Sequence, residues 1–299
     1  MKSITELLGI QYPILQGAMT HIARYPLVSA VSEAGGLGII AASGLTGEEL
    51  REQIRETNKR TDKPFAVNLM LQMDNISEQI DVLVTEGVKI VTTGAGTPKA
   101  YMDRLKKTDI KVFPVVPSVK IAQKMEHLGV DGVIAEGMEA GGHIGTTTTM
   151  ALIPQVAQAV NIPVIAAGGI GDGRGMAAAF ALGARGVQLG TAFLTAAECP
   201  IHENYQQAIL QADDTATVVL HKAHGGAVRG LKNTLTNEES SDAFSLEALK
   251  RAADEGFVDQ GFVISGQIAG LFTHLRPAKA LIEAMYAEAE AISQSIKID

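Results

Sequence analysis

The sequence contains no tryptophan, a single cysteine and few aromatic residues of any kind. Aromatics make up 4% of its 299 residues, and Cys199 is the one thiol. One cysteine excludes an intramolecular disulfide framework and a multi-cysteine metal site, and no histidine or carboxylate cluster has transition-metal spacing. The hydrophobic residues, 46% of the chain, are therefore mainly small and aliphatic. That composition is typical of helices packed against a parallel sheet, and no metal site is predicted.

Long hydrophobic runs and an excess of positive charge are also missing. No apolar run approaches the roughly 20 residues of a membrane span. The first nine residues, MKSITELLG, carry an acid and lack the apolar core of a signal peptide. The net charge of −8 at pH 7 argues against nucleic acid as a partner, because no basic face dominates. We therefore expect a cytoplasmic protein that binds neither a membrane nor nucleic acid.

Short β-branched runs, each followed by a helical pattern, recur through the first two-thirds of the chain. They predict strands at intervals of roughly 20 to 30 residues. The predicted strands are 12–16, 37–40, 65–68, 90–93, 112–116, 132–135, 163–166 and 186–189. Apolar residues at i, i+3 and i+4 predict the intervening helices, for example over 76–84. These repeats favour an α/β fold, a (β/α)8 TIM barrel, with an open doubly wound sheet as the alternative.

The repeat ends after the eighth predicted strand, which divides the chain into three parts. Residues 1–197 are expected to form the barrel, and residues 198–262 a small subdomain inserted on the substrate side. Residues 263–299 are expected to return to the barrel, ending in an Ala- and Glu-rich amphipathic helix that packs on its wall. The alternative for the insertion is surface decoration without a function.

The active site of an α/β barrel lies at the C-terminal ends of its strands, whatever the reaction. The predicted residues there are Gln16, Gly17, Ala18, Met19, Asn68, Glu136, Ala167, Gly168, Gly169, Ile170, Gln188, Gly190 and Thr191. Glycine turns after the last two strands favour phosphate binding by backbone N–H groups. The amides of Gln16, Asn68 and Gln188 suit the edge of a heteroaromatic ring. Alternatively, Asn68 and Gln188 only satisfy a polar layer of the barrel.

The loop after the sixth predicted strand reads EGMEAGGHIG and spans residues 136–145. Its glycines allow the backbone to approach a ligand closely. Its histidine, His143, is the side chain whose ordinary pKa lies near neutrality, so it is the candidate for proton transfer. A tight turn with a solvent-facing histidine is the alternative, and for His21 the solvent-facing interpretation is favoured. A Schiff-base aldolase needs a lysine at the C-terminal end of a strand, whereas Lys63, Lys89 and Lys111 all precede predicted strands. The pattern indicates a phosphate-anchored cofactor beside one histidine.

These segments resemble the flavin-dependent enoyl-[acyl-carrier-protein] reductases of bacterial fatty-acid synthesis, known as enoyl reductase II or the FabK family. More distantly they resemble the nitronate monooxygenases (2-nitropropane dioxygenase-like proteins) on the same barrel. The resemblance runs nearly end to end and includes 34–40, 114–118 and 163–170. The Glu-Ala-Gly-Gly-His element at 139–143 is shared with nitronate monooxygenases, whereas Ala-Val-Arg ending at Arg229 and the segment 266–271 favour the reductase.

The resemblance implies FMN as the cofactor, NADH or NADPH as the reductant and an enoyl thioester on acyl carrier protein as the substrate. The phosphate would lie on 168–170 and 190–191, and the catalytic histidine would be His143. The ring would lie near Gly17, Met19, Asn68, Gly141 and Gly142, with Ser265 and Gln267 on its far side. The family usually has a second glycine where Ala18 stands, which puts acyl-chain preference in doubt.

The resemblance also implies partners beyond the cofactor. A homodimer is expected, and dependence on a monovalent cation is left open. The carrier protein is acidic, as is this chain, so a local basic patch of Lys222, Arg229 and Lys232 is the candidate docking site. In the alternative, Arg229 is structural and the lysines are merely solvated. Three alternatives stay open: oxidation of alkyl nitronates by O2 on the same FMN, non-redox chemistry on a sugar phosphate, and binding of a flavin or nucleotide without turnover.

Overall fold

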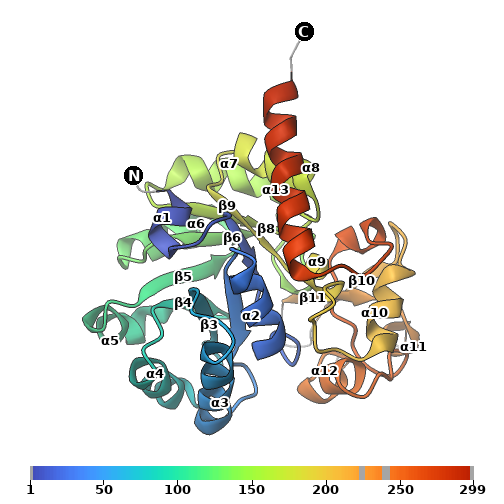
Figure 1. Ribbon diagram of the computed structural model, residues 1–299, viewed down its shortest axis with the longest axis horizontal. Coiled ribbons are helices and arrows are strands. Elements are labelled where there is room, and N and C mark those ends of the chain that lie inside the picture. The colour runs from blue at the N-terminus through green and yellow to red at the C-terminus, as the bar shows by residue number, and fades with distance from the viewer. Residues whose placement is uncertain (1–2, 222–225, 238–242, 297–299) are drawn as a thin grey trace.

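A computed structural model describes residues 3–221, 226–237 and 243–296 (Figure 1). Eight parallel strands form one sheet in the order β1-β9-β8-β6-β5-β4-β3-β2. Their bounds are β1 Ile14–Gln16, β2 Gly38–Ala41, β3 Phe65–Met70, β4 Ile90–Gly94, β5 Lys111–Val116, β6 Val133–Glu136, β8 Val164–Ala167 and β9 Gly186–Leu189. The sheet curls into a nearly closed barrel, so the predicted (β/α)8 architecture is confirmed.

Helices alternate with these strands and cover the outside of the barrel (Figure 1). They are α2 Tyr25–Glu33, α3 Gly47–Asn58, α4 Ile76–Thr85, α5 Met102–Lys107 after the short 3-10 helix η1 Pro98–Tyr101, α6 Val119–His127, α7 Thr149–Ala159, α8 Gly173–Ala181 and α9 Thr191–Leu194. Local sequence sets several of their starts. Thr46 and Glu49 form a capping box at α3, and Asp172 accepts a hydrogen bond from Gly175 N–H at α8. Such caps satisfy N–H groups that lack partners within the helix.

Side chains alternate between the barrel interior and the helix layer along every strand. Leu15, Ile39 and Ile134 belong to the small interior cluster, whereas Ile14 and Ile40 belong to the larger cluster between strands and helices. This alternation fixes which polar residues at the strand ends face the barrel mouth. It is the main way in which the fold positions the site.

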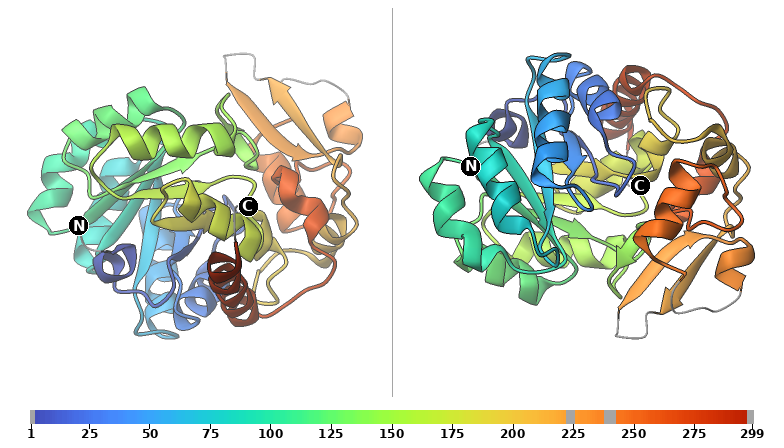
Figure 2. Two further views of the ribbon diagram at one scale, coloured as in Figure 1. Left: turned by 90° about the horizontal axis from the view of Figure 1, so that it is seen from above. Right: turned by 90° about the horizontal axis from the view of Figure 1, so that it is seen from below.

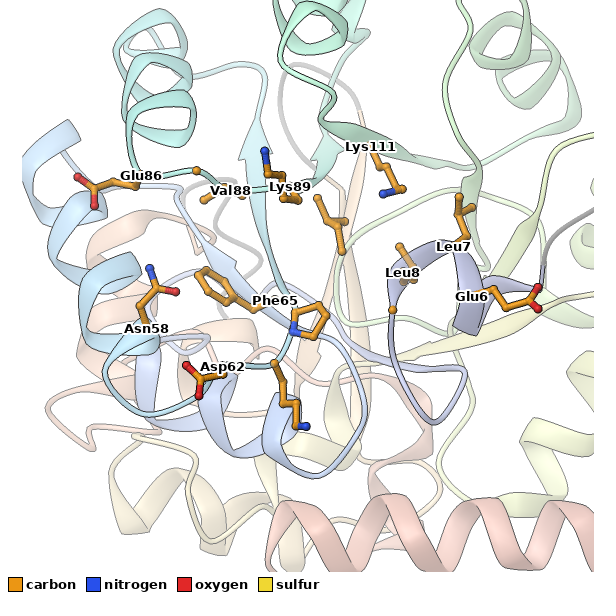
Figure 3. A pocket seen from close by; sticks show the side chains of 15 residues that line it. Glu6, Leu7, Leu8, Asn58, Asp62, Phe65, Glu86, Val88, Lys89 and Lys111 are labelled. Atoms are coloured by element: carbon orange, nitrogen blue, oxygen red, sulfur yellow. The ribbon is translucent and has the colours of Figure 1, made fainter.

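The N-terminal end of the barrel is plugged by α1 Ile4–Leu8, whose Ile4 and Leu8 join the interior cluster. A cavity of about 380 Å³ lies at this end, between α1 and the starts of β3, β4 and β5 (Figure 3). Lys63, Lys89 and Lys111 lie around it. Because strands begin here, this is the end of the barrel that serves stability rather than catalysis.

A second, three-stranded sheet lies beside the barrel mouth (Figure 2). It is antiparallel in the order β10-β11-β7, with bounds β10 Thr217–His221, β11 Ala227–Leu231 and β7 Gly142–Ile144. The helices α10 Glu203–Leu210, α11 Thr234–Asn237 and α12 Leu246–Ala253 accompany it, and Val228, Leu249 and Phe262 form a small core. The sequence predicted a loop at 136–145, so β7 is a correction: this barrel loop contributes a strand to the sheet of the inserted segment.

The last part of the chain returns to the barrel. The 3-10 helix η2 Gln267–Leu271 lies near α9 and α10, and α13 Ala278–Ser295 packs along α8 and α2 (Figure 1). Ile282 and Met285 are buried there, as an amphipathic helix on a barrel wall requires. Among the described residues, no helix is long and apolar enough to cross a membrane.

Candidate functional site

A cavity opens at the C-terminal ends of β1, β6, β8 and β9 and is closed by the segment that leads into η2. The lining residues that the sequence predicted are Gly17, Ala18, Met19, Glu136, Gly141, Ala167, Gly168, Gly169, Ile170, Gln188, Gly190 and Thr191. The lining residues that it did not predict are Glu139, Ala140, Leu194, Ile264, Gly266 and Ile268. The cavity therefore lies where α/β barrels carry their active sites.

Two neighbouring loops present unused backbone donors to this cavity. Gly168 and Gly169 have φ values of 94° and 69°, which turn the chain sharply after β8. Within the described part of the chain, the N–H groups of Gly169, Ile170, Gly190 and Thr191 donate to no protein acceptor. Backbone donors near the surface of a cavity need partners. Adjacent N–H groups that point into a cavity suit an anionic ligand such as a phosphate.

Three polar side chains face the barrel mouth above the apolar interior. Asn68, Glu136 and Gln188 occupy the inward positions of β3, β6 and β9, by the alternation described above. Asn68 Nδ2 donates to Thr92 Oγ1 at 2.9 Å, and Asn68 does not line the cavity. Glu136 and Gln188 do line it. Their side chains are thus the polar groups that a ligand in the mouth meets first.

Gln16 points the other way, toward the helix layer, because it neighbours the inward-facing Leu15. Its Nε2 donates to the carbonyls of Gly17 (2.6 Å) and Ile39 (3.3 Å), and its Oε1 accepts the Ile39 N–H at 3.1 Å. The two bonds to Ile39 cross the seam between β1 and β2, where Leu15 and Leu37 form an isolated bridge. The amide is completely buried and occupied by backbone. Gln16 therefore closes the barrel and leaves no group for a ligand.

The two glutamates of the loop after β6 have different surroundings. Glu139 accepts hydrogen bonds from Thr149 N–H at 2.9 Å and from Thr149 Oγ1 at 3.0 Å, at the start of α7. No hydrogen bond or ion pair reaches the Glu136 carboxyl group from the described residues. Burial without a partner raises the pKa of the Glu136 carboxyl to about 7. The Glu139 carboxylate holds the loop against α7, whereas the Glu136 carboxyl group is available to a ligand.

His143 lies on β7, two residues after Gly141, which lines the cavity. Its backbone pairs with Val228 of β11, and its ring packs edge-on against Phe244 with 4.9 Å between ring centroids. The residue is exposed and is not among those that line the cavity. The structure therefore places the predicted catalytic histidine on a defined strand beside the site, held against an aromatic ring.

Arg229 anchors the loop that carries these residues. Its Nε and Nη2 donate to the Met138 carbonyl at 3.2 and 3.1 Å, and its Nη1 donates to Thr217 Oγ1 at 2.9 Å. The side chain is 3% exposed. Arg229 therefore does not belong to a surface patch for a partner, which corrects that prediction. Lys232 is exposed, and Lys222 lies outside the described residues.

The segment after β11 and α12 closes the site through its backbone. Gly266 N–H donates to Thr191 Oγ1, and Gln267 N–H donates to the Glu139 carbonyl, each at 2.9 Å. A Cβ on Gly141 would lie 2.7 Å from the Ser265 carbonyl carbon. Neither Ser265 nor Gln267 lines the cavity, and neither does Gly142, which starts β7. The segment 266–271 was the sequence signal for this contact, but its cavity-facing residues Gly266 and Ile268 were not singled out.

Comparison with known proteins identifies the family. The family model described as nitronate monooxygenase matches residues 1–80 and 72–288. The chain belongs to the nitronate monooxygenase family. It is 34% identical to a probable nitronate monooxygenase of Staphylococcus saprophyticus, over 97% of this chain and 98% of that protein. It is also 34% identical to the (3aS,4S,5R,7aS)-5-hydroxy-7a-methyl-1-oxo-octahydro-1H-indene-4-carboxyl-CoA dehydrogenase of Rhodococcus jostii, over 96% and 95%.

Solved structures extend this result within the nitronate monooxygenase-like superfamily. FabK from Thermotoga maritima superposes with a TM-score of 0.94 at 42% identity, covering 98% of each chain. A nitroalkane oxidase from Streptomyces ansochromogenes superposes with a TM-score of 0.89 at 28% identity, covering 99% of this chain and 100% of that one. The predicted resemblance to the FabK and nitronate monooxygenase families is thus confirmed. Both families are FMN-dependent flavoproteins, so these likenesses indicate an FMN-dependent oxidoreductase.

The backbone donors that line the cavity suit the phosphate of this family's cofactor. The unused N–H groups after β8 and β9 match a terminal phosphate. Gly17 and Gly141 let the walls of the cavity pack closely, since a Cβ at Gly17 would lie 3.3 Å from the Gln188 side chain and one at Gly141 would lie 2.7 Å from the Ser265 carbonyl carbon. Among residues 3–221, 226–237 and 243–296, no group of three or more histidine, cysteine or acidic residues could hold a metal ion.

His21 lies at the edge of the mouth and is only partly solvent-facing. Its side chain is 20% exposed, and its Nδ1 lies 4.0 Å from Asp254 Oδ2 at the end of α12. Burial and the nearby Arg24 lower its pKa, against the opposing effect of Asp254. His21 therefore joins the barrel to the inserted segment, and it is not among the cavity-lining residues.

Proposed function

We propose that this protein is an FMN-dependent enoyl-[acyl-carrier-protein] reductase that reduces trans-2-enoyl thioesters with NADH or NADPH. The observation that best supports this proposal is the similarity to FabK from Thermotoga maritima, which is 42% identical over 98% of the chain. The nitroalkane oxidase compared over the same length is 28% identical. The Rhodococcus jostii relative is named for a coenzyme A thioester, which supports a thioester as the substrate class.

The residues of the site divide the work of such a reaction. When bound, FMN supplies the hydride chemistry between the nicotinamide and the β-carbon of the enoyl thioester. The N–H groups of Gly169 and Thr191 hold the phosphate. Charge that develops on the thioester oxygen needs a donor, and the α-carbon needs a proton. His143 is the side chain beside the mouth suited to either role.

The first experiment follows the flavin absorbance near about 450 nm in the purified protein under anaerobic conditions. NADH or NADPH is added first, and a trans-2-enoyl thioester second. Bleaching by one nicotinamide, followed by recovery with the thioester and formation of the saturated product, supports the enoyl reductase. A flavoprotein that nicotinamides reduce but no enoyl thioester reoxidises would overturn it.

The variant His143→Ala tests the role of the histidine. Loss of general acid–base help costs about 10²- to 10⁴-fold in turnover, whereas bound FMN should be retained, because His143 does not line the cavity. His127→Ala is the matched control, since His127 is an exposed histidine at the end of α6. Equal turnover in the two variants would remove His143 from the mechanism.

Nitronate oxidation is the second candidate, favoured by the family model and by the Staphylococcus saprophyticus relative. There His143 would remove the proton α to the nitro group of a neutral nitroalkane, which gives the nitronate that is then oxidised, and O2 would be the electron acceptor. The same anaerobic sample discriminates: reduction by an alkyl nitronate, reoxidation by O2 and indifference to nicotinamides would favour the monooxygenase. A protein that takes up no flavin, even on reconstitution with FMN, would leave a non-redox phosphate-binding enzyme.

The proposed carrier protein requires a basic docking surface on an acidic chain. Lys232 is the exposed member of the predicted patch among the described residues. Lys232→Glu should raise KM for a carrier-bound substrate and leave KM for the coenzyme A thioester unchanged. Lys120→Glu, an exposed position on α6, is the control. Equal changes for both substrates would count against docking at this surface.

A further inference from the structure

Glu136 is a half-buried titratable group that the proposed chemistry does not use. It ends β6 and faces the cavity from an inward strand position, beside Gln188 and Ala167. Within the described chain its carboxyl group forms no hydrogen bond and no ion pair. Its neighbour Glu139 is held by Thr149 instead. The unpartnered carboxyl therefore faces the place where a ligand in the mouth would lie.

The surroundings of Glu136 disfavour its charged form. The barrel interior below it is apolar, with Ile134 on the same strand and Val115 on β5. Among the described residues that line the cavity, the one other titratable group is Glu139, an acid. The residues of β1, β8, β9 and the segment 264–268 that line the cavity include no cation. Arg229 of β11 interacts with Glu139 but does not line the cavity. Burial accordingly raises the pKa of Glu136 to about 7.

A bound flavin would strengthen this preference. FMN carries a phosphate, and filling the cavity with its ring excludes water, so both changes further disfavour a carboxylate. A buried carboxylate without a partner costs several kcal/mol, whereas a carboxylic acid that donates a hydrogen bond does not. A flavin ring offers nitrogen and oxygen acceptors along its polar edge. An acid at Glu136 can donate to them, and a carboxylate cannot.

We propose that Glu136 binds the flavin as a neutral carboxylic acid that donates a hydrogen bond to the cofactor, so that flavin binding takes up one proton. This inference rests on the proposed function only in taking FMN as the ligand. It assigns to Glu136 a binding role toward the cofactor and none in transferring hydride. The proton that is taken up stays on the Glu136 carboxyl.

The expected consequence is a linkage between pH and flavin affinity. Above about pH 7, where free Glu136 is ionised, affinity should fall by up to tenfold for each pH unit. Glu136→Gln keeps a donor of similar shape but has no proton to take up. The phosphate of FMN also titrates near pH 6, but it does so equally in both proteins. The difference in pH dependence between the wild type and Glu136→Gln therefore reports the protonation of Glu136 alone.

The experiment is calorimetric titration of flavin-free protein with FMN at pH 8, in buffers with different ionisation heats. The wild type should take up nearly one proton more than Glu136→Gln. Glu139→Gln is the matched control: it removes a carboxyl that Thr149 already holds, so its proton uptake should equal that of the wild type. Equal uptake in the wild type and in Glu136→Gln would overturn the inference.

Two further outcomes keep the result decisive. Riboflavin lacks the phosphate, so its binding to the wild type tests the proton uptake alone, even if Glu136→Gln does not fold. Binding of riboflavin without proton uptake at pH 8 would overturn the inference and leave the reductase untouched. If neither flavin binds the wild type at any pH, the proposed function fails, and this inference fails with it.

Discussion

Glu136 and Glu139 stand three residues apart, and their carboxyl groups meet opposite surroundings. Thr149 donates two hydrogen bonds to Glu139, whereas Glu136 meets an apolar wall and the open cavity. The two residue types are identical in the sequence. Their chemistry differs because burial and hydrogen bonding, and not residue type, set the pKa of a carboxyl group.

The raised pKa of Glu136 predicts a pH dependence of stability in the flavin-free protein. The folded state holds this proton up to about pH 7, whereas the unfolded chain releases it near pH 4.5. The contribution of protonated Glu136 to the free energy of unfolding is therefore complete below about pH 4.5 and is lost as the pH rises from 4.5 to 7. Relative to wild type, Glu136→Gln should gain about 3 kcal/mol of unfolding free energy between pH 4 and pH 8. Urea titrations across this range measure the difference, and parallel curves would contradict the prediction.

Gly169 allows a second prediction at this scale. Its φ is 69°, and a Cβ there would lie 3.1 Å from Glu139 Cβ at the edge of the cavity. Gly129, after α6, has a φ of 77°, and beyond its chain neighbours no heavy atom lies within 4 Å of the place that a Cβ would take. Gly129→Ala therefore introduces backbone strain at a positive φ but no steric contact. Both variants should lose about 1 kcal/mol of stability.

Only Gly169→Ala should also weaken FMN binding, by tenfold or more, because it disturbs the unused N–H groups after β8. Quenching of flavin fluorescence on binding measures the affinity. An unchanged affinity in Gly169→Ala would show that this loop does not hold the phosphate.

At the scale of elements, β7 shows how a glycine-rich loop becomes a strand. Its three residues have little strand preference of their own, since the first is glycine with a φ of 75°. Pairing with β11, more than eighty residues later, and the bonds from Arg229 to the Met138 carbonyl hold it in place. His143 therefore depends on the inserted segment for its position.

Replacing Arg229 should loosen this arrangement. Arg229→Lys keeps the charge but cannot form both bonds to the Met138 carbonyl and the bond to Thr217. We expect a loss of about 1 to 3 kcal/mol in the free energy of unfolding, with turnover reduced more than FMN content. Arg251→Lys, at an exposed ion pair with Glu247, should cost less than about 1 kcal/mol. Denaturant titrations and turnover measurements on both variants provide the comparison. Equal losses of unfolding free energy in Arg229→Lys and Arg251→Lys would show that Arg229 does not anchor the loop.

At the scale of the whole molecule, the barrel closes at a seam with few backbone bonds. Gln16 supplies side-chain bonds across it, whereas Gln188 faces the cavity from the opposite side of its strand layer. These two amides looked equivalent as residues at strand ends. The closed barrel separates them into one that holds the fold and one that faces a ligand.

Methionine substitutions should separate these roles. Gln16→Met leaves the Ile39 N–H buried without its acceptor and should lower the free energy of unfolding by about 1 to 3 kcal/mol, with FMN affinity nearly unchanged. Gln188→Met should weaken FMN binding and leave the free energy of unfolding nearly unchanged. Thermal unfolding and FMN titration of both proteins provide the comparison. Loss of FMN affinity in Gln16→Met without loss of stability would reverse the assignment.

Local sequence patterns were enough to predict the barrel and most of its mouth. β-branched runs spaced by helical patterns are local features, and strands of such a barrel end on one face, so glycines and polar residues at those ends could be recognised as a site. Strand alternation, also local, would have turned Gln16 away from the mouth. The resemblance of short motifs placed the family, because those motifs are contiguous in the chain.

Features that depend on contacts between distant segments emerged only in the folded chain. Such contacts made β7 a strand, buried Arg229 beneath the loop and brought Ile264, Gly266 and Ile268 against the cavity. They also left Glu136 without a partner among the described residues and thereby raised its pKa. Burial and partner identity are properties of packed neighbours, and no window of sequence contains those neighbours.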